Sequence, residues 1–205
     1  MKKNILFLIF LFFLCSTVSA LAIPFSFTDI PSDDNPGLDL SGNFSGDVSV
    51  SGSQVKFTLF NNGPDISTIA AVYFEYNPDN LLMNGAFSAV DSSSGVTFEM
   101  LDNLNLPQGN NISFDADFAQ NAGSPAPDNG INIYEYGSFL FDGDFNAVLL
   151  AMNDGSLRIG MHVINIGDLS DSYVSKPIPE PASILLLGIG LLGFGIVTRK
   201  KAKHM

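Results

Sequence analysis

Pairs of aspartates are the residues in the middle of this chain whose types and spacing could do chemistry. Asp115 and Asp117 lie two residues apart in an alternating segment, so they would share one face of a strand. Asp142 and Asp144 flank a glycine in an acidic turn. Such oxygen-rich groups bind Ca²⁺, and paired carboxylates also hydrolyse glycosides. The alternative is that they are solvated turn carboxylates, with Asp144 as a helix N-cap.

The sequence offers little support for catalysis or for a bound cofactor. The twelve-residue calcium loop of EF-hands is not present, so calcium stays a secondary alternative. His162 lies in a strand-like segment, where we expect it to face outward or to form a local hydrogen bond. No serine lies in a G-x-S-x-G context. We therefore expect a protein without catalytic residues and without a resident cofactor.

The N-terminus has the pattern of a secretory signal peptide. Lys2 and Lys3 precede an apolar run over residues 5–14, and small residues follow up to Ala20. This order predicts a signal helix over residues 1–20, export through the Sec machinery and cleavage by signal peptidase after Ala20. The alternative is an uncleaved N-terminal anchor. Cys15 is the chain's one cysteine and would leave with the signal, so no disulfide is expected in the mature protein.

The C-terminus combines a rigid acidic tripeptide, a short apolar run and a basic end. Pro179 and Pro181 restrict their own backbone and that of the residues before them, which displays Glu180 on an extended strip. The run over residues 184–197 would span roughly 21 Å as a helix, less than a bilayer core. Four basic residues then hold the end of the chain in the cytoplasm and leave the body outside. These residues are Arg199, Lys200, Lys201 and Lys203.

This order of features resembles the C-terminal sorting signal of PEP-CTERM proteins. The resemblance implies a sorting signal over residues 178–203, made of the motif Pro179-Glu180-Pro181, a transmembrane helix over 182–198 and the basic tail. It also implies a partner, an exosortase-type transpeptidase in the membrane that cuts near the motif. An ordinary single-pass anchor is the alternative. The resemblance implies where the protein is sorted, and it implies no catalytic residues.

Charge limits the partners of the exported part. Residues 21–181 contain all 21 acidic residues and only three basic ones, which gives a net charge of −18. Such a surface repels nucleic acid, so no nucleic-acid partner is expected. The three basic residues are Lys56, Arg158 and Lys176.

Alternating hydrophobic patterns between the two ends predict an all-β body. We expect an antiparallel β-sandwich, jelly-roll-like, with at most one short helix, over residues 21–168, followed by a polar linker over 169–177. One helix is predicted over 145–152, between acidic and glycine-containing turns. Residues 121–129 are expected to form a loop. Strands are expected at 23–27, 48–51, 55–60, 67–76, 87–90, 96–101, 112–118, 136–141 and 157–164.

Together these patterns predict an exported surface or extracellular-matrix protein with a non-catalytic ectodomain. Its precursor would be anchored in the membrane, and its mature form would lie at the cell surface or outside it; the resemblance implies a Gram-negative bacterium. By the resemblance, exopolysaccharide is a plausible partner. The alternatives are a glycan- or calcium-binding matrix module and, with less support, an extracellular hydrolase. Tyrosines gathered on one face would favour the binding module, and two carboxylates facing each other across a cleft would favour the hydrolase.

Overall fold

The computed structural model describes residues 22–31 and 39–178. The expected signal peptide, the motif Pro179-Glu180-Pro181, the expected transmembrane helix over 182–198 and the basic tail lie outside these ranges. Within them, none of the helices has both the length and the apolar character needed to cross a membrane.

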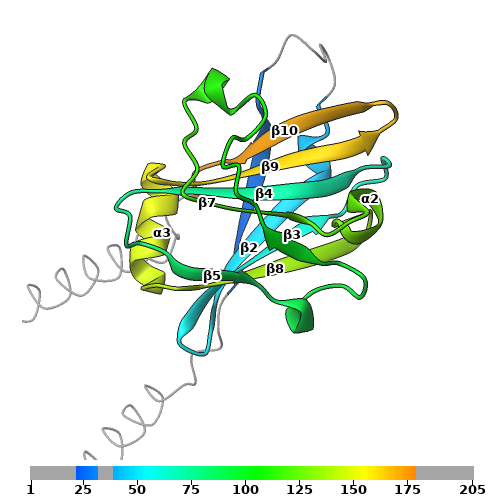
Figure 1. Cartoon of the computed structure of the whole chain (residues 1–205). Coiled ribbons are helices and arrows are strands. Elements are labelled where there is room, and N and C mark those ends of the chain that lie inside the picture. The colour runs from blue at the N-terminus through cyan, green and yellow to red at the C-terminus, as the bar shows by residue number, and fades with distance from the viewer. Residues whose placement is uncertain (1–21, 32–38, 179–205) are drawn as a thin grey trace, which may run out of the picture.

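Ten antiparallel strands form the body of the protein (Figure 1). Their order across the sheet is β5-β8-β3-β2-β1-β10-β9-β4-β7-β6. This confirms the antiparallel all-β class. The strands are β1 Ile23–Asp29, β2 Phe44–Ser51, β3 Gln54–Asn61, β4 Thr68–Tyr76, β5 Met83–Phe87, β6 Phe98–Met100, β7 Phe118–Ala122, β8 Glu135–Asp142, β9 Leu157–Ile166 and β10 Leu169–Ser175.

Strand β1 joins the two halves of the structure into one sheet. Its first residues pair with β2, with Ile23 opposite Val48, and its last residues pair with β10, with Phe27 opposite Ser175. The sheet is therefore continuous and nearly closed, like a barrel, instead of the two separate sheets of a jelly-roll-like sandwich. The two edge strands approach each other through the rings of Phe87 in β5 and Phe98 in β6, whose centroids lie 5.5 Å apart.

The segment expected to be a polar linker, residues 169–177, is largely the strand β10. It lies inside the sheet, between β1 and β9, so the domain continues beyond residue 168. Tyr173 is fully buried in the core, and the neighbouring Asp171 and Ser172 are buried as well. The polar residues misled the interpretation because the burial of β10 depends on its pairing with β1, which lies at the other end of the chain.

Phenylalanine rings fill the interior of the sheet. Phe74 of β4 is fully buried and contacts Phe57 on β3 at 5.3 Å between ring centroids. It also contacts Phe141 on β8 at 4.7 Å, so it connects the two halves of the sheet across the core. Most of these contacts are tilted or edge-on, the arrangement that aromatic pairs prefer.

The helix α3, Phe145–Asp154, lies between β8 and β9 and covers one end of the sheet (Figure 1). The carboxylate of Asp144 accepts a hydrogen bond from the Ala147 backbone N–H at 2.8 Å, and Gly155 ends the helix with a φ of 81°. Both ends agree with the sequence prediction. A second, one-turn helix, α2 Ala126–Asn129, lies in the segment expected to be a loop, so there are more helices than expected.

Two predicted strands are wrong. Residues 112–118 form the end of a 3₁₀-helix, η3 Gly109–Ile112, and a loop, and a strand begins only at Phe118. Phe114 packs with Leu106 and Tyr73 in a second apolar cluster outside the main core. The alternating pattern here therefore reflects a loop that lies on the sheet. Strand β5 likewise ends at Phe87, and a 3₁₀-helix, η2 Ala89–Asp91, follows it.

Replacing Phe74 by alanine is expected to lower the free energy of unfolding by about 3–5 kcal/mol, because a cavity would form where four aromatic contacts meet. Phe60, half-buried on the outer face of β3, provides the control. Its change to alanine should lower stability by about 1 kcal/mol. Chemical denaturation of the full chain in mild detergent measures both values. Equal losses would contradict the central position of Phe74.

Candidate functional site

The chain enters the expected sorting motif directly from the folded core. The Lys176 backbone N–H donates a hydrogen bond to the Ser26 carbonyl oxygen at 2.8 Å, which extends the pairing of β1 and β10. The Ile178 N–H donates to the Met152 carbonyl oxygen in α3 at 3.3 Å. Ile178 is only 6% exposed and belongs to the main core cluster. No flexible spacer therefore separates the core from Pro179.

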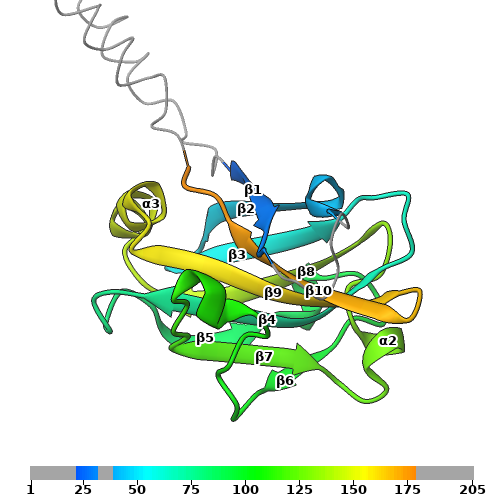
Figure 2. The ribbon, with the colours of Figure 1, turned by 90° about the horizontal axis from the view of Figure 1, so that it is seen from above.

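Both ends of the described domain leave it at the same place. Because β1 and β10 are antiparallel neighbours, Ala22 before β1 and Ile178 after β10 lie at one end of the sheet (Figure 2). The helix α3 and the turn between β2 and β3 also lie at this end. We call it the α3 end. Ala20, the expected signal-cleavage residue, and Pro179 are the neighbours of this end in sequence.

The Asp142 and Asp144 carboxylates are both engaged by nearby donors. Asp142 accepts hydrogen bonds from the side-chain amides of Gln54 at 2.9 Å and Asn84 at 2.8 Å. These bonds, with that from Asn84 the stronger, lower the pKa of Asp142. Asp144 caps α3, as the alternative interpretation of the sequence had it. The two carboxylates therefore stabilise the corner between β8 and α3.

Asp115 and Asp117 line an open cleft of about 420 Å³ beside Glu75 and Arg158. Asp117 accepts a hydrogen bond from the Tyr76 backbone N–H at 2.8 Å. Glu75 accepts one from the Asp115 N–H at 3.2 Å and is paired with Arg158. The structure does not join this pair to Asp142 and Asp144. Among the residues that the structure describes, no three or more metal-ligating side chains are grouped so that they could hold an ion.

Arg158 on β9 fastens the loop between β6 and β7 to the sheet. Its guanidinium group pairs with Glu75 and donates hydrogen bonds to the carbonyl oxygens of Ile112 at 3.0 Å and Ser113 at 2.7 Å. It also lies 5.2 Å from the centre of the Phe114 ring, a cation–π contact. Sequence reasoning missed this role, because Glu75 and the loop are far from Arg158 along the chain.

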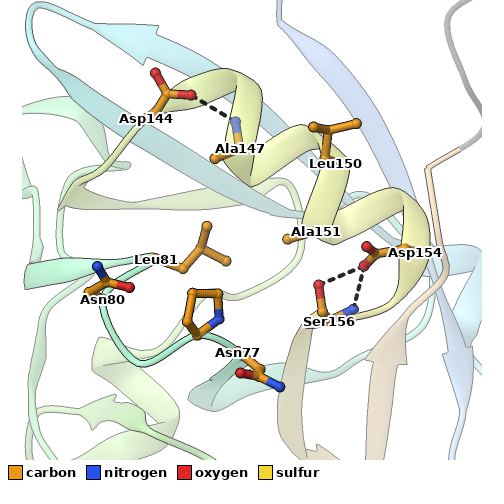
Figure 3. Close-up of a pocket in the computed structure, with 10 residues that line it drawn as sticks. Asn77, Asn80, Leu81, Asp144, Ala147, Leu150, Ala151, Asp154 and Ser156 are labelled. Carbon is orange, nitrogen blue, oxygen red and sulfur yellow. Dashed lines mark hydrogen bonds between the residues drawn. The ribbon is translucent and has the colours of Figure 1, made fainter.

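A second open cavity of about 420 Å³ lies between α3 and the turn after β4 (Figure 3). Leu81 and Leu150 make its sides apolar, whereas Asn80 and Asp154 lie at its rim. Asp154 accepts hydrogen bonds from the Ser156 N–H at 2.9 Å and from its hydroxyl at 2.6 Å, and these bonds lower its pKa. No aromatic side chain lines this cavity, so it offers no stacking surface for a sugar ring.

A pair of carboxylates that the sequence did not reveal lies where β1 and β10 meet, at the end of the sheet opposite α3. Asp171 is 2% exposed and accepts a hydrogen bond from the Ser172 N–H at 2.8 Å. Burial raises the pKa of Asp29 to about 6, helped by the charge of Asp171 and a hydrogen bond with it, and by Asp39. One oxygen of Asp29, Oδ1, is buried without a hydrogen-bond partner among the described residues. The pair can hold a proton at mildly acidic pH.

His162 and Tyr173 lie beside this pair of carboxylates, and the pKa values of both side chains are shifted by burial. The Tyr173 hydroxyl accepts a hydrogen bond from the Leu40 N–H at 3.3 Å, and burial raises the pKa of this tyrosine. His162 lies on the outer face of β9, where its Nδ1 is 3.3 Å from the Ser172 hydroxyl oxygen. Burial lowers the pKa of His162 and so favours the neutral ring. This local hydrogen bond matches the structural role expected for the histidine.

The tyrosines do not form one cluster. Tyr73 and Tyr173 are buried, and Tyr76 is half-buried beside the cleft of Arg158. Tyr134 and Tyr136 are exposed at the start of β8. The Tyr136 ring lies 5.9 Å from that of Phe60, its direct partner on β3. The rings of Phe60 and Tyr136 thus form an aromatic pair on the outer face of the sheet, and the exposed Tyr134 precedes β8.

Replacing Arg158 by methionine should lower the free energy of unfolding by about 1–3 kcal/mol, since the hydrogen bonds from its charged group to Glu75, Ile112 and Ser113 are lost, the first two of them partly buried. Proteolysis within residues 101–117 should also become faster. Lys56 provides a matched control, because its ion pair with Asp91 spans 3.6 Å at the surface. Its change to methionine should cost less than about 1 kcal/mol. An intact, protease-resistant loop in the Arg158 variant would contradict the anchoring role.

The pKa of Asp29 predicts a dependence of stability on pH. It is about 6 in the folded protein and 3.8 without the fold, so the folded state binds more protons between these values. This group's contribution to stability therefore falls as pH rises from about 4 to 6 and is constant above. The variant Asp29→Asn should exceed the wild type in melting temperature at pH 7, and the gain should shrink towards pH 4. Asp102→Asn, in an exposed loop, is the control. A gain that is independent of pH would contradict this assignment.

Comparison with known proteins identifies the end of the chain. Residues 177–201 match the family model of the PEP-CTERM protein-sorting motif. The match includes Pro179, Glu180 and Pro181, and it ends before Lys203. Neither the curated proteins nor the solved structures gave a match. The motif indicates an exported, membrane-anchored precursor that exosortase-type machinery recognises. The chain is therefore a PEP-CTERM sorting domain-containing protein.

Proposed function

We propose that this protein is a non-enzymatic component of the cell surface or extracellular matrix. It is exported through the inner membrane with its body outside and its C-terminus in the cytoplasm. An exosortase-type transpeptidase then cuts near Pro179-Glu180-Pro181 and removes the apolar segment and basic tail. The β-domain stays at the surface or is released, in a matrix that contains exopolysaccharide.

The observation that carries this proposal is the position of the motif relative to the fold. Ile178 is the last core residue, and the matched motif surrounds the point where the chain leaves the domain. A cut after this residue would remove no part of β1–β10. All ten strands of the domain would therefore remain intact when the sorting signal is removed.

The surroundings of the candidate acids support a non-catalytic ectodomain. Asp117 accepts a backbone N–H, Asp142 accepts two amides and Asp144 caps a helix. These bonds give structural roles to three of the four acids that the sequence singled out. A hydrolase is the least favoured alternative. In the cleft that Asp115, Asp117 and Glu75 line, Glu75 is paired with Arg158 and Asp117 holds the Tyr76 backbone N–H.

One observation favours a second function, the binding of a neutral glycan. The rings of Phe60 and Tyr136 lie together on an outer sheet face, and the nearby Tyr134 is 76% exposed. Exposed aromatic groups that are not needed for the core often mark binding surfaces. The charge of −18 over residues 21–181 disfavours acidic polysaccharides as ligands.

Changing Pro179 and Glu180 to alanine together should prevent removal of the C-terminal tail in the native host. The extended, acidic strip that the transpeptidase reads would be lost, while the fold would not change. Intact mass spectrometry measures the outcome. The wild-type protein should begin at Leu21 and end near residue 181, whereas the variant should extend to Met205.

The control is the change of Lys176 to alanine, directly before the matched residues 177–201. This side chain is exposed, so the variant should be cut like the wild type. A wild-type mass that extends from Leu21 to Met205 would contradict exosortase sorting. A fully processed Pro179/Glu180 variant would show that the tripeptide is not what the enzyme reads.

A further inference from the structure

We propose that the α3 end of the domain rests on the outer surface of the membrane while the precursor is anchored. The domain loses this contact with the membrane when the C-terminal apolar segment is cut off. The inference rests on the sorting route proposed above, because that route requires an anchored precursor. It adds an interaction surface and a partner, the lipid surface itself.

The length of the chain between fold and membrane supports this contact. Five residues, 179–183, separate the buried Ile178 from the apolar run that begins at Ile184. Fully extended, they span at most about 18 Å. The polar layer of one leaflet occupies about 5–7 Å of this distance. The α3 end therefore stays within about one helix diameter of the lipid head groups.

Apolar side chains are exposed at this same end. Leu150 projects from α3 and is 68% exposed. Val50 lies beside the turn between β2 and β3, and Met83 opens β5. Both are exposed, and the register places Met83 opposite Asp142, just before α3. These side chains can enter the boundary between head groups and acyl chains as those of surface-bound helices do.

Charge does not hold the domain at the membrane. The helix α3 has no basic residue, and acidic Asp144 and Asp154 lie at its two ends. The whole exported part carries a net charge of −18, which anionic lipids repel. The contact therefore depends on a few apolar side chains and on the tether. A short tether supplies an effective concentration on the order of millimolar, which is lost when the tether is cut.

Site-specific fluorescence can test this orientation. The signal-cleaved chain, residues 21–205, contains no cysteine of its own and receives one labelled cysteine, at Leu150→Cys or at Ile66→Cys. Ile66 is a matched control, because it is 67% exposed but lies between β3 and β4, at the end opposite α3. The chain is reconstituted in phosphatidylcholine vesicles that contain lipids with a quencher on the head group. We expect several-fold stronger quenching of the label at 150 than of the label at 66.

A tether variant tests the release step. Twenty glycine and serine residues inserted after Ile178 lower the effective concentration of the domain at the membrane. Quenching at position 150 should then fall to the level at position 66. Quenching that persists would mean that the domain binds lipid by itself, and it would overturn the release on cleavage.

The outcomes separate this inference from the sorting route. If the signal-cleaved chain does not float with the vesicles in a density gradient, its C-terminal segment does not anchor it, and the sorting proposal itself is contradicted. If the chain floats but both labels are quenched equally, or the label at 66 more, only the orientation is overturned.

Discussion

The shared pairing of β1 is the interaction on which the rest of the structure depends. The first half of this strand completes the sheet of β2, β3, β8 and β5, and the second half completes that of β10, β9, β4, β7 and β6. Because the first and last strands of the domain are neighbours, the sheet closes around one phenylalanine-rich core. The same pairing brings both chain ends to the α3 end. The geometry of sorting is therefore a consequence of how the barrel closes.

Elements that depend on local signals could be predicted from the sequence. The hairpin of β2 and β3 follows from alternation on both sides of a Gly-Ser turn, and α3 follows from the cap by Asp144 and the stop at Gly155. Elements that depend on distant partners could not. β10 looks polar because Asp171 and Ser172 find their partners inside the sheet. The loop after β6 has the alternating hydrophobic pattern of a strand because its apolar side chains, such as Phe114, pack against Tyr73 of strand β4.

The same distinction applies to the sites. The sorting motif is contiguous in sequence, and the family match at residues 177–201 confirms it. Arg158 and Glu75 are 83 residues apart, and Asp29 and Asp171 are brought together only by the pairing of β1 and β10. The sequence pointed instead to acids that are close along the chain. Of those acids, Asp142 and Asp144 stabilise the corner between β8 and α3, and turns are where aspartate commonly occurs.

The position of β10 also determines how the protein would carry mechanical load. This strand is bonded on both sides, to β1 and to β9, and it runs straight towards the point where the chain leaves at Ile178. A pull on the domain away from its attachment acts along the strand axis. Its hydrogen bonds to both neighbours are then loaded together in shear instead of opening one after another. In the anchored precursor proposed above, this arrangement would resist unfolding of the domain by a pull on its C-terminal attachment.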